Sequence, residues 1–158
     1  MTRALSESLE DYLEAIYHIV VAKQAARAKD ISRRMGVSQS SVTGALHALT
    51  ERGLVNHAPY DLVTLTAGGR AAAEDIVHRH GVLKGFLVSV LAVEEGAADE
   101  IACKMEHHIR GTVLRRLGYL GQFIAECPRA DSDQWLRRFL EFCRQQEEAV
   151  GPRAERAT

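Results

Sequence analysis

A break at Gly36-Val37-Ser38 between two helical stretches, followed at once by a hairpin pattern, constrains the fold of this chain most. Residues 28–35 suit a short helix, which Gly36 can end because glycine adopts left-handed backbone readily. Ser38 can cap a second helix over residues 39–52, whose apolar positions Val42, Ala45, Leu46 and Leu49 share one face. The next segment, LVNHAPYDLVTLT, alternates apolar and β-branched residues around Pro59-Tyr60-Asp61 and predicts a β-hairpin.

An opening helix precedes this motif. Its apolar residues recur at helical spacing, and Ser6 or Ser8 can cap it; the apolar positions are Leu9, Tyr12, Leu13, Ile16, Tyr17 and Val20. The order helix, helix, turn, helix, hairpin is that of a winged helix-turn-helix, in which the hairpin is the wing. We therefore expect this fold at residues 1–72.

The rest of the chain is helical in pattern. A long helix is expected from Thr66 to about residue 91, with Gly81 or Gly85 as places where it can break or bend. Further helices are expected over 97–109, 111–123 and 133–148, the last capped by Asp131 or Ser132 after a break at Cys127-Pro128. The fold class is thus mainly α, with an all-helical second domain at 73–148 and a disordered tail at 149–158.

Composition narrows the function classes. The 158 residues are 46% hydrophobic and 26% charged, which is typical of a globular protein, and no apolar run is long enough to cross a membrane. The formal net charge is −1, so any binding to nucleic acid must depend on a local basic patch. Three widely spaced cysteines argue against a disulfide framework and favour a reducing, cytoplasmic location.

The start of the second motif helix is the predicted DNA-reading segment. In a helix-turn-helix this helix enters the major groove, and its N-terminal residues meet the base edges. Short hydroxyls and an amide suit contacts with bases or phosphates, and nearby arginines suit phosphates. The candidates are Arg33, Arg34, Ser38, Gln39, Ser40, Ser41 and Thr43. The alternative is that the serines only cap the helix and their neighbours are solvated.

Metal-ligand side chains recur on three helical segments. Asp11 and Glu14 lie three residues apart on the opening helix, and Cys103, Glu106 and His107 share one face of a later helix. His80 lies between these segments. Carboxylates, imidazoles and one thiolate suit a divalent ion such as manganese, iron or zinc, and not calcium. Taken singly, each residue also fits a solvated helix face or a packed core.

At these residues the chain resembles the diphtheria toxin repressor and manganese transport regulator family. The matching strings are SLEDYLEAIY at 8–17, VSQSSVTGALHALTERGLV at 37–55, LTAGGRAAA at 65–73, RHGVLKGFL at 79–87 and ACKMEHHI at 102–109. The resemblance implies a homodimer that represses metal-homeostasis genes when loaded with Mn(II) or Fe(II). It also implies binding to double-stranded operator DNA and a helical domain for metal binding and dimerisation.

The resemblance also implies which residues bind the metal: Asp11, Glu14, His80, Cys103, Glu106 and His107. Asp11 with Glu14 is similar to the manganese regulators, whereas Cys103 is similar to the iron-responsive repressors. The ancillary site of the iron type has an acidic residue where this chain has Lys84 and a histidine where it has Asp99. A second metal that uses His80 with Glu14 and Glu106 is compatible with this pattern.

Two other functions remain open on the sequence. A DNA-binding redox sensor would use a reactive thiol among Cys103, Cys127 and Cys143, which requires access and a low pKa. A metal-dependent hydrolase would need an open coordination position and a general base. No nucleophile motif stands out in the sequence, so we expect a regulator without enzymatic activity.

Overall fold

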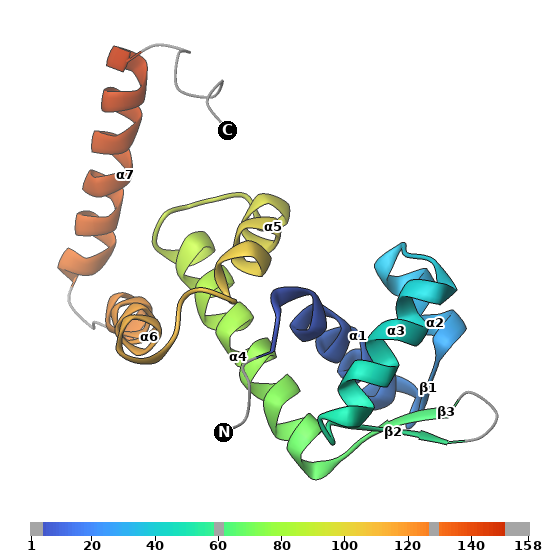
Figure 1. Cartoon of the computed structure of the whole chain (residues 1–158). Coiled ribbons are helices and arrows are strands. Elements are labelled where there is room, and N and C mark those ends of the chain that lie inside the picture. The colour runs from blue at the N-terminus through green and yellow to red at the C-terminus, as the bar shows by residue number, and fades with distance from the viewer. Residues whose placement is uncertain (1–4, 59–61, 127–129, 151–158) are drawn as a thin grey trace. The chain divides into compact units, whose positions relative to one another are not determined.

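The computed structural model describes residues 5–58, 62–126 and 130–150, and it is mainly helical with one small antiparallel sheet (Figure 1). The chain divides into two compact units, residues 1–79 and 80–158, which we call the N-terminal unit and the C-terminal unit. The fold class predicted from the sequence, a winged helix followed by a helical domain, is confirmed. The predicted domain bounds at residues 72 and 148 stay predictions.

Three helices of the N-terminal unit form as the sequence predicts. They are α1 (Glu7–Lys23), α2 (Ala28–Met35) and α3 (Gln39–Glu51). Ser6 caps α1 by accepting a hydrogen bond from the Leu9 amide, which satisfies one of the exposed donors at the helix start. Gly36 ends α2 with a φ of 68°, the left-handed conformation that glycine adopts without steric cost.

The sheet forms the wing and ties it to the helices. Strand β3 (Leu62–Leu65) lies between β2 (Val55–Ala58) and β1 (Ala26–Arg27), and both pairings are antiparallel. In the hairpin, Val55 pairs with Leu65, and the predicted turn at 59–61 lies outside the described residues. The two-residue β1 was not predicted, because so short a segment has no visible period.

One hydrophobic core holds the N-terminal unit together. Apolar side chains of α1, α2, α3, the sheet and the start of α4 (Ala67–Ser89) meet in it. Its fully buried large members are Leu13, Ile16, Ile31, Val42, Leu46, Leu49, Val55, Val63 and Ile76. Because α3 presents its apolar stripe to this core, the opposite face of α3 is left exposed.

Helix α4 corrects one expectation: it runs without interruption through Gly81 and Gly85. Glycine in a helix interior costs only about 1 kcal/mol relative to alanine. Leu83 and Leu87 are buried in the core of the C-terminal unit, and this packing holds the helix across both glycines. Helix α4 therefore carries residues of both units in one element.

The remaining helices differ from the expected bounds. Helix α5 (Glu95–Met105) begins earlier because Glu94 caps it, and it ends before Glu106 and His107, which the sequence had placed inside the helix. Helix α6 is Gly111–Glu126. Helix α7 (Ala130–Val150) already includes Asp131 and Ser132, so neither residue precedes it as the predicted cap. The tail from residue 151 lies outside the described residues.

Candidate functional site

The N-terminus of α3 presents a cluster of exposed hydroxyls. The Ser38 Oγ accepts a hydrogen bond from the Ser41 amide at 3.2 Å and lies 2.8 Å from the Ser40 Oγ and 2.9 Å from the Ser41 Oγ. All three serines are exposed. Ser38 is therefore the helix cap, and the first turn of α3 still presents polar atoms to solvent.

The other predicted DNA-contacting residues are exposed as well. Gln39 and Thr43 lie on the outer face of α3, and the Thr43 hydroxyl donates to the Gln39 carbonyl at 2.9 Å. Arg33 and Arg34 form the exposed last turn of α2. Hydroxyls, an amide and two guanidinium groups are thus exposed on the helix-turn-helix, a set of groups suited to phosphate and base contacts. Their contact with DNA stays a prediction.

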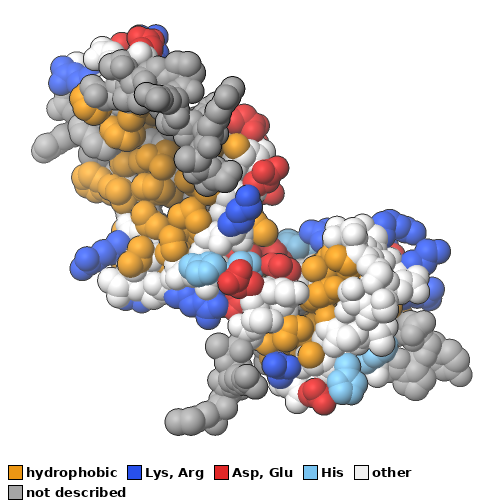
Figure 2. Space-filling model, turned by 45° about the horizontal axis from the view of Figure 1, so that its top comes forward, with side chains coloured by type: hydrophobic (Ala, Val, Ile, Leu, Met, Phe, Trp, Pro, Cys, Tyr) orange, Lys and Arg blue, Asp and Glu red, His pale blue; other side chains and the backbone are white. Residues whose placement is uncertain are grey.

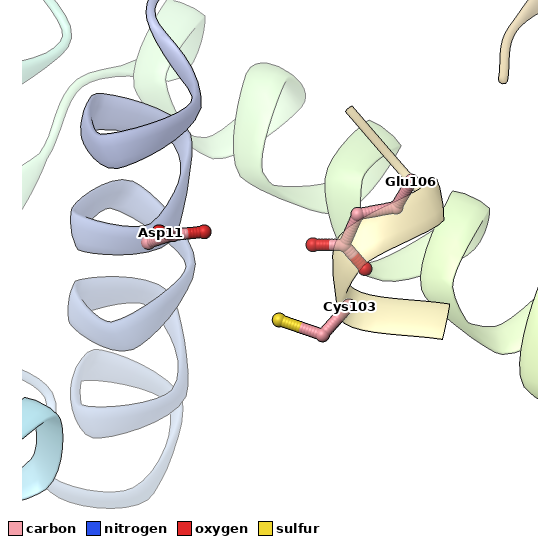
Figure 3. Close-up of side chains that lie close together, drawn as sticks. All are labelled: Asp11, Cys103 and Glu106. Atoms are coloured by element: carbon pink, nitrogen blue, oxygen red, sulfur yellow. The ribbon is translucent and has the colours of Figure 1, made fainter. Parts of the chain in front are cut away.

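Of the predicted metal ligands, α1 carries Asp11 and Glu14. Both are half-buried, and they lie one turn apart on the helix. The Glu14 Oε1 lies 3.5 Å from the His18 Nε2 on the same helix. Figure 3 shows Asp11 projecting sideways from α1. The N-terminal unit therefore offers two carboxylates close together on α1.

The end of α5 brings together three of the predicted ligands in the C-terminal unit. The Glu106 side chain is completely buried, and its Oε2 lies 2.8 Å from the His80 Nδ1. Its Oε1 lies 3.8 Å from the His107 Nε2. A buried carboxylate is stable only with donors or cations close by, and the His80 ring provides such a group at Oε2. Cys103 is exposed and projects from α5 on the same side as Glu106 (Figure 3).

A chain of charged groups continues from His80 across α4 and α5. The His80 Nε2 lies 3.2 Å from the Asp99 Oδ1, which also accepts a hydrogen bond from the Lys84 Nζ at 2.8 Å. The same Lys84 Nζ lies 3.4 Å from the Glu95 Oε1. The hydrogen bond from Lys84 lowers the pKa of Asp99, and Asp99 in turn raises the pKa of Lys84.

Sequence reasoning noted Lys84 and Asp99 only as departures from a family pattern and missed their contacts. A signal was present in the spacing. His80 and Lys84 are four residues apart on α4, as are Glu95 and Asp99 on α5, so each pair shares a helix face. Two such polar faces within a helical domain indicate a polar contact between the helices.

A buried ion pair next to the α1 carboxylates was also missed. The Arg79 Nη2 lies 3.2 Å from the Glu10 Oε2, and the two side chains are only 3% and 5% exposed. Glu10 is the residue before Asp11, so the pair fixes the part of α1 that carries the predicted ligands. Glu10 falls on the same face as Leu13 and Tyr17, and a charge among apolar positions was the available signal.

Chemically, these side chains can hold a divalent metal ion. The donor set contains carboxylate oxygens, imidazole nitrogens and a thiol sulfur, the ligands that first-row transition metals accept. The burial of Glu106 beside His80 and His107 shows that part of the set is already assembled. That the six predicted ligands bind metal, at one centre or at two, stays a prediction. No helix among the described residues is long and apolar enough to cross a membrane.

Comparison with known proteins agrees with this arrangement. Residues 4–63 match the family model of the iron dependent repressor N-terminal DNA binding domain. Residues 66–135 match the model of the iron dependent repressor metal binding and dimerisation domain. The first match covers the winged helix, and the second covers the segment with His80, Cys103, Glu106 and His107.

Individual relatives of the chain are helix-turn-helix transcriptional regulators. An uncharacterized HTH-type transcriptional regulator of Methanocaldococcus jannaschii is 36% identical over 114 residues, covering 72% of this chain and 91% of that protein. The HTH-type transcriptional regulator MntR of Bacillus pumilus is 34% identical over 119 residues, covering 75% and 82%.

A solved structure, a manganese-dependent transcriptional repressor in complex with manganese, matches with a TM-score of 0.63 and 32% identity. The match covers 73% of this chain and 53% of that chain, so it spans about half of the solved protein. The two family models and the curated relatives together match residues of both units, and all of them describe repressors or transcriptional regulators. The chain therefore belongs to the iron-dependent repressor family, that is, to the diphtheria toxin repressor and manganese transport regulator family of metal-dependent transcriptional regulators.

Proposed function

We propose that the chain is a cytoplasmic transcriptional repressor that binds operator DNA as a homodimer when loaded with Mn(II) or Fe(II), and that it controls metal-ion homeostasis genes. The observation that carries this proposal is the buried Glu106 carboxylate, held between His80 and His107 in a chain with a winged helix. Carboxylates and imidazoles are common ligands of divalent transition metals.

We assign the ligands to two groups. One group would consist of Asp11, Cys103, Glu106 and His107, and the other of Glu14, His80 and Glu106, so each would draw donors from both units. A bound divalent ion supplies positive charge and several coordination positions there. Carboxylates and imidazoles suit manganese and iron, and the Cys103 sulfur favours the softer ions iron, cobalt and zinc.

The mechanism follows from where the donors lie in the chain. Asp11 and Glu14 belong to α1 of the N-terminal unit, and the other four belong to the C-terminal unit. If the carboxylates of α1 shared one centre with Cys103, Glu106 and His107, their mutual repulsion would fall and the two units would have fewer relative placements. These side chains would thereby favour one placement of the winged helix once they held a divalent ion.

Reading of DNA is assigned to the exposed start of α3. Ser38, Gln39, Ser40, Ser41 and Thr43 would reach base edges and phosphates in the major groove, and Arg33 and Arg34 would contact phosphates. A dimer places two such helices on half-sites about one helical turn, or a multiple of it, apart. A fixed placement of the winged helix therefore decides whether both helices reach DNA together.

We assign the contact with the second copy of the chain to an exposed apolar face of α6. Val113, Tyr119, Leu120 and Phe123 are between 43% and 67% exposed, and their spacing places them on one side of the helix. Figure 2 shows hydrophobic side chains gathered over the C-terminal unit. So many large apolar groups on one helix face indicate a protein interface, in agreement with the dimerisation domain that this segment matches.

Metal-dependent DNA binding tests the proposal. A duplex is first selected from a random-sequence pool by the protein in MnCl₂, and its affinity is then measured by fluorescence anisotropy at one salt concentration. We expect tight binding with Mn(II) or Fe(II) and a large loss when a chelator is added. The Asp11→Ala and His107→Ala variants should lose the stimulation by metal and keep the fold. Equal affinity with metal and chelator would contradict the proposal.

The same assay separates the thiol-switch alternative, for which the exposure of Cys103 is the supporting observation. That alternative predicts that peroxide changes DNA affinity in the presence of chelator. The repressor proposal predicts that peroxide has no such effect without metal.

The dimer is tested by sedimentation. Phe123→Glu places a charge in the α6 face and should yield monomers. Val21→Glu, at a side chain 59% exposed on α1, should leave the dimer intact. If the Phe123→Glu variant formed dimers of unchanged stability, α6 would not be part of the interface.

A further inference from the structure

We infer that Lys84 and Asp99 act together as positioning residues that hold the His80 ring in its metal-binding orientation. The inference deepens the proposed function, on which it rests for the role of His80 as a ligand. It starts from one continuous line of contacts within the C-terminal unit, running from Glu106 through His80 and Asp99 to Lys84.

Each ring nitrogen of His80 faces a different carboxylate. The Nδ1 lies 2.8 Å from the Glu106 Oε2 inside the proposed site, and the Nε2 lies 3.2 Å from the Asp99 Oδ1 outside it. A metal-binding histidine commonly donates its second ring N–H to a carboxylate, which fixes the ring orientation and makes the ligating nitrogen more basic. Asp99 has the position of that carboxylate.

Asp99 itself needs a partner to stay in place. Its side chain is 55% exposed, so water and alternative rotamers compete with the contact to His80. The Lys84 ammonium, on the same α4 face as His80, lies 2.8 Å from the Asp99 Oδ1, the oxygen that also faces the ring. Lys84 also reaches the Glu95 Oε1 at 3.4 Å, one turn before Asp99 on α5, so it bridges the two helices.

This arrangement predicts an unexpected direction for the change in metal affinity when the charge of Lys84 is removed. By Coulomb's law alone, removing the positive charge of Lys84 from the neighbourhood of the site should tighten the binding of a divalent cation. If Lys84 instead holds Asp99 against His80, its removal should weaken binding, because the ring is no longer fixed. The two explanations therefore differ in direction as well as in size.

The test measures Zn²⁺ affinity by competition with a chromophoric chelator in the full chain. We expect Lys84→Gln to bind Zn²⁺ several-fold more weakly and Lys84→Arg, which keeps a cation, to bind close to wild type. Asp99→Ala should lose about 10- to 100-fold, the usual cost of removing such an outer partner. Arg116→Gln and Glu100→Gln are the controls, since each removes one exposed charge from α6 or α5. Tighter or unchanged binding in Lys84→Gln would overturn the inference.

A second readout does not depend on metal. Nitrogen NMR of the histidine rings, with His80 assigned through His80→Gln, reports the Nε2–H and its exchange with water in chelator-treated protein. We expect a protected Nε2–H in wild type and Lys84→Arg, and faster exchange in Asp99→Ala and Lys84→Gln. Exchange that is the same in all four proteins would overturn the inference even if the metal is bound as proposed. Wild-type protein that binds no metal would instead refute the proposed function.

Discussion

Arg79 and Glu10 are a charged pair in the interior of the N-terminal unit, where neither group keeps its hydration. Removing one member of a buried pair leaves the other charge in a poorly solvated place and costs about 3–5 kcal/mol. We expect Arg79→Met to lower the free energy of unfolding by about this amount, and the double variant with Glu10→Gln to recover part of the loss.

Urea denaturation of the two single variants and the double variant measures this coupling. Arg70→Met is a suitable control, because its contact with Glu74 at 3.9 Å lies on the surface and such pairs contribute about 0–1 kcal/mol. Additive losses in the double variant would show that the pair does not act as a unit.

Cys103 is the softest donor of the proposed site. Replacing its sulfur by oxygen in Cys103→Ser should weaken Zn²⁺ binding more than Mn²⁺ binding, because thiolate favours softer ions. Competition titrations with each metal give the ratio of the two affinities. Cys143→Ser, at a half-buried position on α7, is the matched control and should leave the ratio unchanged. An unchanged ratio in Cys103→Ser would exclude the sulfur from the site.

At the scale of elements, the start of α4 requires glycine at position 69, because its backbone there passes close to the backbone of Leu54, the residue before β2. A Cβ at Gly69 would lie 1.8 Å from the Leu54 carbonyl oxygen, whereas one at Gly68 would meet nothing nearer than the Thr66 Oγ1 at 3.8 Å. The approach is fixed by the Thr66 hydroxyl, which donates to the Gly53 carbonyl and accepts from the Gly69 amide. The backbone of Leu54 could make room for a side chain at position 69 only if the adjoining strand β2 of the wing also moved.

Two alanine substitutions should therefore differ in sign. Gly69→Ala should lower the melting temperature because the backbone must shift. Gly68→Ala should raise it slightly, because alanine favours the helix over glycine by up to about 1 kcal/mol in free energy. Thermal denaturation followed by circular dichroism compares the two. Equal melting temperatures would show that the junction between wing and α4 is loose.

The start of α5 predicts a pH dependence. Hydrogen bonds from the Gly96 and Ala97 amides lower the pKa of Glu94, so the folded state favours its charged form. A carboxyl with a lowered pKa stabilises the fold above its unfolded pKa of about 4.3 and loses this contribution as the pH falls through the folded value.

Glu94→Gln, which does not titrate, isolates this effect. Wild type should melt above the variant near neutral pH, and the difference should close as the pH falls to about 3. Glu100→Gln, which removes an exposed carboxyl further along α5, is the matched control. A difference that stays constant over this range would contradict the cap as its source.

These elements show how far the sequence could predict the structure. The bounds of α2 and the caps of α1 and α3 depend on local chemistry, namely a left-handed glycine and serine side chains, and they were predicted. The continuity of α4 through Gly81 and Gly85 depends on packing of Leu83 and Leu87 against residues distant in sequence. The contacts of Lys84 with Asp99 are likewise tertiary, so spacing indicated their helix faces and not the pairing.

At the scale of the whole molecule, metal and DNA would be two ligands of one coupled equilibrium. If the metal raises DNA affinity by restricting the two units, then DNA must raise metal affinity by the same factor. A metal site that only stabilises the fold is not coupled to DNA binding, so its metal affinity is the same with and without DNA.

The most direct test is therefore the Mn²⁺ affinity of the wild-type protein, measured with and without saturating amounts of the selected duplex at one salt concentration. We predict tighter Mn²⁺ binding with duplex, by the factor that Mn²⁺ gives DNA binding, which for coupled sites is typically about 5- to 150-fold. A scrambled duplex of the same length provides the control. The same Mn²⁺ affinity with and without the selected duplex would contradict the account.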